Sequence, residues 1–417
     1  MKNLVVFLFL SITCFVSAQE LDVSAEFRPR FEYRHGYKTL APDGMDAATF
    51  VSQRSRLNFK YESEKLNTFI SFQSVRVWGD EPTLSTNDAN AVSIHEAWAQ
   101  AFLSPEFSLK IGRQEISYDD QRIFGSVNWV QQARRHDALV AIYTPNDKSR
   151  LDFGLAINEN SESLFSQDYI ANNNKAFQYV WYHTNFNNAS LSFLMLNNGL
   201  AFDNNGEQKV DYNQTIGSRF TYGKTKFKAD ASLYFQTGKI ADVDLSAYNV
   251  AANMSYKLSG TLNAGLGVEL LSGTDMNATN NKLKSFSPWF GTNHKFNGWM
   301  DYFYVGNHSK SVGLVDFSAN LKYQKDKYSF AIVPHLFSAA ATVIDGSGVK
   351  MSDRLGTEID LTFGYKVASN ITLQVGYSQM FATETMEVLK GGDHNATNNW
   401  GWAMFVFKPK LFSYKKE

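Results

Sequence analysis

Residues 111–137 read IGRQEISYDDQRIFGSVNWVQQARRHD and fit neither a helix nor an ordinary loop. No apolar stripe recurs at a spacing of three to four residues, as an amphipathic helix requires. The segment is nevertheless too apolar for a solvated loop, because its middle contains Ile123, Phe124, Val127, Trp129 and Val130. It also carries four arginines: Arg113, Arg122, Arg134 and Arg135. We predict that this segment folds into the lumen of a β-barrel, where its arginines help to select what passes.

The start of the chain has the features of a secretory signal peptide. Lys2 supplies a positive charge, a short apolar run follows, and a small-residue cleavage site ends at Ala18. We therefore expect residues 1–18 to be removed and residues 19–417 to form a single domain. The one cysteine, Cys14, leaves with the signal, so the mature chain offers no disulfide, thiol nucleophile or cysteine-based zinc site.

The composition indicates an exported membrane protein. Loss of the signal leaves 39 basic and 41 acidic side chains, which is no footprint for nucleic-acid binding. Aromatic residues make up 15% of the sequence, whereas proline occurs only eight times. No second long apolar stretch follows the signal, so we expect no transmembrane helix. An exported, aromatic-rich chain of this kind is typical of a barrel in the lipid of the bacterial outer membrane.

Polar and apolar residues alternate along many segments, as they do on β-strands with one polar and one apolar face. The apolar faces comprise Phe27, Phe31 and Tyr33; Leu57, Phe59 and Tyr61; and Leu355, Ile359, Leu361, Phe363 and Tyr365. The opposite faces comprise Arg28, Arg30, Glu32 and Arg34; Arg54 and Arg56; and Arg354, Glu358 and Asp360. A soluble β-sandwich would show the same alternation, so the choice of fold depends on the connections.

The connections favour an antiparallel transmembrane β-barrel of about 18 strands, with 16 also compatible with the pattern. Short joins, such as Ser63-Glu64 and Asn187-Asn188, alternate strictly with longer ones. The longer joins are 37–47, 79–90, 116–134, 161–173, 199–209, 239–243, 273–309, 342–351 and 384–397. Short periplasmic turns opposite long extracellular loops are the layout of an all-β outer-membrane barrel.

Arginine is concentrated early in the chain, where eleven of the thirteen arginines lie before residue 151. If the polar faces of the first two strands point inward, Arg28, Arg30, Arg54 and Arg56 form a ladder on the lumen wall. A guanidinium suits carboxylate and phosphate groups, and a ring of such groups in a pore selects anions. The alternative is that these arginines pair with acids and only make the lumen rigid.

Two of the outer joins suggest further roles. The join 273–309 is rich in aromatic residues, so we expect it to fold into or over the pore, where its rings suit either sugar binding or packing. Residues 275–281 and 393–399 share a pattern rich in Asn and Asp. Such oxygens suit calcium, whereas the ordinary composition of outer loops explains the pattern without an ion. We assign no cofactor and keep loop-bound calcium as the alternative.

No motif indicates an enzyme. The eight histidines form no HExxH and no pair at metal-ligand spacing, and no GxSxG is present. His136 and Asp137 are adjacent, but neighbours on a strand point to opposite faces. We therefore predict no catalytic residue and no metal site.

Residues 112–139, GRQEISYDDQRIFGSVNWVQQARRHDAL, resemble the signature of alginate-export-type outer-membrane proteins. The matching positions are Gly112, Arg113, Gln114, Asp120, Arg122, Gly125, Trp129, Arg134 and Asp137. Residues 290–301, FGTNHKFNGWMD, are similar to a later block of the same family. The resemblance implies an 18-stranded barrel in which an anionic polysaccharide diffuses through an arginine-rich constriction, with loops gating both ends.

Carried over by position, the four arginines of residues 111–137 would form that constriction, with Asp120 as their acidic partner. The full set of predicted pore-lining residues is Arg28, Arg30, Arg54, Arg56, Arg113, Asp120, Arg122, Trp129, Arg134, Arg135, Arg354 and Glu358. Barrels of one fold carry different solutes, so the substrate is not carried over. We predict a passive channel for acidic polysaccharide or oligosaccharide. A general or nutrient porin, a plugged structural or adhesive barrel, and a periplasmic export or uptake partner remain open.

Overall fold

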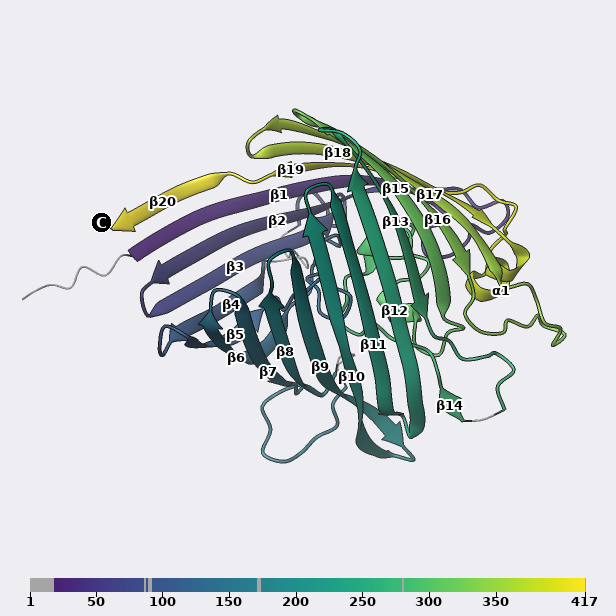
Figure 1. Cartoon of the computed structure of the whole chain (residues 1–417), viewed down its shortest axis with the longest axis horizontal. Coiled ribbons are helices and arrows are strands. Elements are labelled where there is room, and N and C mark those ends of the chain that lie inside the picture. The colour runs from purple at the N-terminus through teal and green to yellow at the C-terminus, as the bar shows by residue number, and fades with distance from the viewer. Residues whose placement is uncertain (1–18, 86–87, 89–91, 171–173, 280, 417) are drawn as a thin grey trace, which may run out of the picture.

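The computed structural model describes residues 19–85, 88, 92–170, 174–279 and 281–416. The predicted signal peptide lies outside these residues. The described chain forms a closed antiparallel barrel in which β1 pairs with β2 on one side and with the last strand on the other (Figure 1). The predicted fold class is therefore confirmed.

Eighteen strands span the barrel in the described part of the chain, because the last spanning strand is broken into β19 and β20 at Lys408-Pro409. The spanning strands are β1 (Gln19–His35), β2 (Ala48–Ser63), β3 (Leu66–Val77), β4 (Ser93–Phe102), β5 (Phe107–Gln114), β6 (His136–Asn146), β7 (Ser149–Ile157), β8 (Ala176–Asn185), β9 (Ala189–Asn204), β10 (Glu207–Lys224), β11 (Phe227–Ile240), β12 (Val243–Lys257), β13 (Leu262–Leu271), β15 (Leu314–Lys325), β16 (Tyr328–Ser338), β17 (Arg354–Ala368), β18 (Ile371–Ala382), β19 (Asn398–Phe407) and β20 (Lys410–Lys416). The short β14 (Lys282–Leu283) pairs in parallel with the outer end of β12.

The two ends of the barrel differ as predicted. The start of β1 and the C-terminus lie with the short turns at one end, and the α1 helix (Glu384–Lys390) lies at the other (Figure 1). The short 3₁₀ helices η1 (Asn293–Lys295) and η2 (Val305–Asn307) belong to the longest connection. No helix in the described residues is long and apolar enough to cross a membrane.

Two predicted long joins are wrong. Residues 199–209 continue β9 and β10 into a hairpin that turns at Asn205 and Gly206, both with positive φ. Residues 239–243 likewise turn tightly at Ala241 and Asp242. Two-residue turns with positive φ match the twist of the paired strands, so the strands extend beyond the membrane instead of ending in loops. β10 has 18 residues, whereas a spanning strand needs about 9–11.

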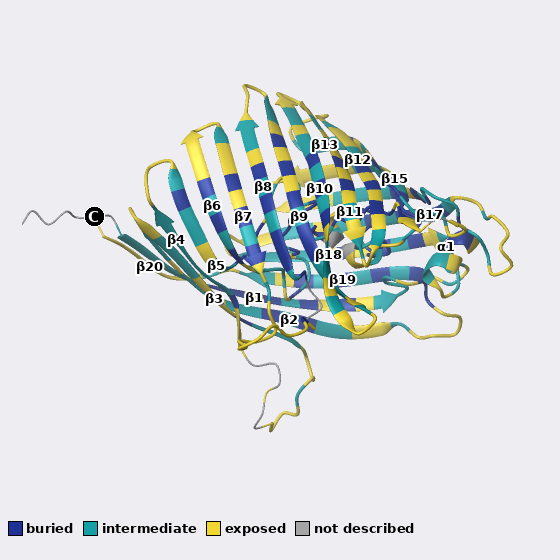
Figure 2. Ribbon diagram, turned by 90° about the horizontal axis from the view of Figure 1, so that it is seen from below, coloured by how far each residue is buried: buried dark blue, intermediate teal, exposed yellow. Residues whose placement is uncertain are grey.

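The alternation along the strands separates lipid-facing from lumen-facing side chains, and it appears as bands of buried and exposed residues in Figure 2. On β1, Phe27 and Phe31 are 48% and 45% exposed, whereas Arg28 and Arg30 are 6% and 4% exposed. Arg54 on β2 is fully buried. The polar faces of the first two strands therefore point into the lumen, as the sequence predicted.

A β-bulge in β17 reverses the predicted directions of two side chains, Arg354 and Leu355. Phe337 pairs with Gly356 and Ser338 pairs with Arg354, so Leu355 is an extra residue in the strand. Leu355 is consequently buried instead of facing lipid. Arg354 lies on the face opposite Glu358 and donates to Thr357 Oγ1 at 2.6 Å. Arg354 therefore does not point into the lumen, because the bulge reverses the alternation that the sequence pattern assumed.

Two connections fill the lumen. We call residues 115–135, between β5 and β6, loop A, and residues 284–313, between β14 and β15, loop B. They pair through a parallel bridge between Phe124 and Phe290, whose rings stack at 5.3 Å. The Gly125 N–H donates to the Phe290 carbonyl at 2.8 Å, and the Thr292 N–H donates to the Gln121 carbonyl at 2.9 Å. The two loops thus form one internal layer across the barrel, as predicted for both segments.

The lipid-facing belt ends at a row of amides near the outer rim. Asn197 donates to Gln178 at 2.8 Å, and Gln214 donates to Asn197 at 2.7 Å. Leu233, which is 42% exposed, lies on the same outward face of β11, midway between this row and the periplasmic turn.

We expect Leu233→Arg to lower the free energy of unfolding by about 2–4 kcal/mol, because it places a charge at the middle of the lipid belt. Gln214→Arg adds the same charge at the amide row and should cost about 1 kcal/mol or less. Urea unfolding of the protein in lipid vesicles measures both. Equal costs for the two variants would mean that the amide row does not mark the border of the membrane.

Candidate functional site

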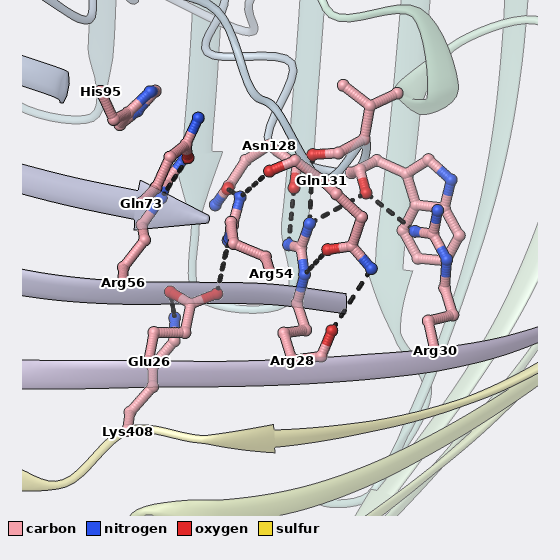
Figure 3. A network of polar contacts seen from close by, with 12 residues as sticks. Glu26, Arg28, Arg30, Arg54, Arg56, Gln73, His95, Asn128, Gln131 and Lys408 are labelled. Atoms are coloured by element: carbon pink, nitrogen blue, oxygen red, sulfur yellow. Dashed lines mark hydrogen bonds and ion pairs between the residues drawn. The ribbon is translucent and has the colours of Figure 1, made fainter. Parts of the chain in front are cut away.

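Loop A is held by an arginine of β1. Arg28 donates through Nη1 to the Asn128 carbonyl at 2.7 Å and through Nη2 to the carbonyls of Trp129 and Val130 at 3.2 and 3.1 Å. Its Nε donates to Gln131 Oε1 at 3.0 Å (Figure 3). The Arg28 guanidinium thus forms four hydrogen bonds, one with each of the consecutive loop A residues 128–131.

The neighbouring ladder arginines extend this attachment. Arg54 donates to Asn128 Oδ1 at 2.8 Å and forms an ion pair with Glu26 at 2.5 Å (Figure 3). Arg30 donates to the Trp129 carbonyl at 2.8 Å, and its guanidinium lies 4.2 Å from the centre of the Trp129 ring. Both arginines therefore hold the same turn of loop A as Arg28.

Arg56 differs from the other three ladder arginines. Its Nε donates to Gln73 Oε1 at 3.0 Å, and Gln73 in turn donates to the Gln132 carbonyl of loop A at 3.2 Å. One of its terminal nitrogens, Nη2, is buried without a partner within the described chain. Arg56 thus supports loop A through one intermediate side chain.

Loop B is held by carboxylates of β17, which is separated from β1 by β18 and β19. Glu358 Oε1 accepts the Met300 N–H at 2.8 Å, and Asp360 Oδ2 accepts the Trp299 N–H at 3.2 Å. Both carboxylates come from β17 and are fully buried. Glu358 therefore points into the lumen as predicted, and it serves as an acceptor for loop backbone.

Arg122 joins loop A to the acidic wall. It forms an ion pair with Glu269 at 2.7 Å and donates to Asn297 Oδ1 at 2.9 Å. Asn297 donates to Glu269 at 2.8 Å and to Asp316 at 3.3 Å. Arg122 therefore cross-links the two loops to β13 and β15. Its side chain is only 3% exposed, so the guanidinium is not available to a passing anion.

Asp120 has a partner that the sequence analysis missed. Arg219 of β10 forms an ion pair with Asp120 at 3.1 Å and another with Asp230 at 3.1 Å. The Lys295 ammonium donates to the Asp120 carbonyl at 2.7 Å. Arg219 occupies a lumen-facing position of a correctly predicted strand, so its alternation was the signal that would have found it.

The remaining predicted arginines lie toward the outer side of the layer. Arg113 donates twice to Asp137, at 2.9 Å each, in a pair that is partly exposed. The next residue, Gln114, points inward and is 1% exposed, so the alternation of β5 places Arg113 on the outward face and not in the predicted pore lining. Arg134 donates to the Gly291 carbonyl of loop B at 2.9 Å. Within the described residues, neither Arg134 nor Arg135 forms an ion pair. Burial lowers the pKa of Arg134 to about 10, so this side chain is still charged at neutral pH.

The internal layer separates two chambers with different linings. The outer chamber has a volume of about 540 Å³ and is lined by Arg134, Arg135, Trp289 and the outer ends of β7, β8 and β9. The periplasmic chamber has a volume of about 640 Å³ and is lined by Trp129, Trp299, Trp402 and the lower parts of β1, β17 and β18. Both volumes lie within the usual range of ligand pockets, and the two linings share no residue.

The Asn- and Asp-rich outer segments are held by protein groups. Asp275 accepts the Thr342 N–H at 2.8 Å, and Asp393 accepts the Asn395 N–H at 2.8 Å. Ligand atoms of Glu387, Asp393 and His394 lie within 4.8 Å of one another. Asn280 of the first segment lies outside the described residues. Loop-bound calcium therefore stays an untested prediction.

Residues 19–401 match the family described as alginate export. The chain belongs to the alginate export family. A comparison with curated protein sequences finds no match. The match confirms the resemblance seen in the sequence, and it places this barrel in the lipid of the outer membrane.

Several solved structures share this fold at low sequence identity. OpdL of Pseudomonas aeruginosa superposes with a TM-score of 0.63 at 12% identity, covering 94% of this chain and 99% of that one. OccAB4 of Acinetobacter baumannii gives 0.62 at 12% identity, covering 95% and 98%. The outer membrane protein opdK of Pseudomonas aeruginosa gives 0.60 at 13% identity, covering 95% and 99%. At this identity the likeness concerns the fold.

We expect Arg28→Met to release loop A, because the carbonyls of residues 128–130 lose their donors at a cost of about 1–3 kcal/mol each. Single-channel recordings in a planar bilayer should show a larger and noisier conductance, and trypsin should cleave after Arg134 or Arg135. Arg76→Met removes an arginine that pairs with Asp88 at the outer rim and should change neither. An unaltered conductance in Arg28→Met would mean that Arg28 does not hold the loop.

Proposed function

We propose that this member of the alginate export family is a passive outer-membrane channel for acidic polysaccharide or oligosaccharide. The family and the barrel fold support passive passage through the outer membrane. The observation that carries the choice of solute is the cationic outer chamber, where two arginines have no carboxylate partner among the residues that the structure describes. No catalytic step is needed for such a role.

The charge balance of the outer chamber is positive. Arg134 and Arg135 both line it, whereas its one carboxylate, Asp137, is already engaged with Arg113. An unpaired guanidinium on a lumen wall attracts anions and binds carboxylates through two parallel donors. An acidic sugar entering from this side meets these groups before it reaches the layer of loops.

The uncharged part of the outer chamber suits a hydroxyl-rich solute. Polar side-chain atoms of Asn174, Asn198 and Trp289 are buried there without a partner within the described chain. Phe177 and Phe290 supply apolar surface next to them. A mixture of amides, an indole and arginines fits a uronic acid better than a small inorganic anion, because it offers contacts beyond charge.

One observation favours the second candidate, a porin without glycan preference. The ladder arginines Arg28, Arg30 and Arg54 use their donors on loop A and on acids of the wall. They therefore contribute less to anion selection than their number indicates. A plugged structural or adhesive barrel is the third candidate, because the two loops cross the lumen.

The test is the reversal potential across a planar bilayer under a salt gradient. We expect the wild type to prefer anions, and we expect Arg134→Gln/Arg135→Gln to lose most of that preference, because two unpaired charges leave the outer chamber. Arg76→Gln removes one charge from the outer rim outside the lumen and should leave the preference unchanged. Conductance without ion preference in the wild type would favour the general porin, and no conductance from folded protein would favour the plugged barrel.

Trigalacturonate added to the extracellular side should reduce the current through the wild type in a saturable way. The double variant should need a concentration about tenfold higher or more for the same block, since a charge-assisted bond contributes about 1.5–3 kcal/mol and each 1.4 kcal/mol is a factor of ten. Equal block of the two proteins would place the anion contact elsewhere in the lumen.

A further inference from the structure

We propose that the periplasmic chamber is a binding site for a sugar ring, which the aromatic groups recognise by its apolar face and the wall recognises by its hydroxyl groups. The inference rests on the proposed passage of a glycan and names a second site for it. This site differs from the outer chamber because it depends on ring contacts more than on charge. The chamber lies between the internal layer and the periplasmic ends of β1, β17, β18 and β19.

Three tryptophans from three separate elements meet at this chamber: Trp129 from loop A, Trp299 from loop B and Trp402 from β19. Trp129 and Trp402 contact each other edge to face, with ring centres 4.8 Å apart, and both belong to or pack against the apolar core of the lumen. Together with Trp299 they also line an open chamber of about 640 Å³. Indole surface that lines an open chamber suits a ligand with an apolar face.

The three rings differ in what they offer. Trp129 is covered by the Arg30 guanidinium at 4.2 Å and by the His294 ring at 4.2 Å, and Trp400 and Trp402 contact it edge to face. Trp402 lies flat on Gly376, where a Cβ would come within 2.2 Å of the indole nitrogen. Trp299 is half-buried and packs against the apolar core, and among the described residues its one contact with another aromatic ring is with His294 at 6.4 Å. Trp299 therefore has the fewest ring contacts of the three indoles and is the best placed for stacking.

The barrel wall beside Trp402 offers hydrogen-bonding groups that are not in use within the described chain. Thr362 of β17 and Thr372 and Gln374 of β18 line the chamber. Within the described chain, none of these three side chains has a hydrogen-bond partner. A hydrocarbon ligand would leave them unpaired, and a small anion would leave the indoles unused. A pyranose ring has C–H groups on its faces and hydroxyl groups around its edge, so it satisfies both sides.

A cation at the lower edge of the chamber makes the site compatible with an acidic sugar. The Lys408 ammonium lies 3.7 Å from Glu26, and its side chain is 59% exposed. Arg28 also lines the chamber, but its donors are used on loop A. Lys408 is thus placed to contact a carboxylate that enters from the periplasm, while the ring contacts do not require one.

The test compares trigalacturonate with its neutral, carboxyl-reduced counterpart. Each sugar is added to either side of a planar bilayer that holds the full-length barrel, and the block of the ion current is titrated. We expect the neutral sugar to block from the periplasmic side at lower concentration than from the outer side. Trp299→Leu should weaken this block about three- to tenfold, because one aromatic contact is lost. Trp78→Leu, at the outer rim, should have no effect.

Trp299 is part of loop B, so a second variant changes a residue of the barrel wall instead. Gln374→Leu removes an amide that would form a hydrogen bond with a sugar hydroxyl group. It should also weaken the periplasmic block by the neutral sugar, and it should leave the conductance unchanged. Equal block from both sides, or block unaffected by Trp299→Leu and Gln374→Leu, would overturn the inference. These results are separable from ion selectivity. If the neutral sugar blocks the channel but the channel shows no anion preference, only the proposed function is contradicted. If the channel prefers anions but the neutral sugar does not block it, only the periplasmic site is contradicted.

Discussion

The structure depends on the hydrogen bonds of two loop backbones that lie inside a barrel. A buried N–H or carbonyl without a partner costs free energy, so every such group in the lumen must be paired. Loop A turns its carbonyls toward β1 and β2, where Arg28, Arg30 and Arg54 donate to it. Loop B turns its N–H groups toward β17, where Glu358 and Asp360 accept. The charge of the wall therefore matches the backbone polarity of the loop beside it.

This matching changes what the arginines of the wall can do. A guanidinium whose donors are committed to carbonyls is a fixed part of the structure, and it attracts a passing anion less strongly than a free one. The two loop A arginines that form no ion pair in the described chain, Arg134 and Arg135, line the outer chamber. The number of arginines in the lumen is therefore a poor measure of anion selectivity, and the unpaired fraction is the better one.

The periodicity of the sequence was sufficient to predict the strands, their number and the inward direction of Arg28 and Arg54, because the alternation is set by the backbone. It failed at Arg354, since a bulge adds one residue without any signal in composition. The sequence also could not predict what the ladder arginines bind. Many of their partners are backbone carbonyls of loop A, and because every residue has a backbone carbonyl, no sequence pattern identifies these partners. The aromatic chamber was hidden for a similar reason, because Trp129, Trp299 and Trp402 are far apart in the chain.

The two loops behave as one layer because their junction is built from backbone bonds and stacked rings. Phe124 and Phe290 lie at the centre of that junction, and both are shielded by the aromatic residues of β8. The layer has a cationic chamber on its outer side and an aromatic chamber on its periplasmic side, against different parts of the wall. The two chambers are lined by different residues. Attraction by charge is therefore concentrated at Arg134 and Arg135 on the outer side, and recognition of a ring is concentrated at the indoles on the periplasmic side.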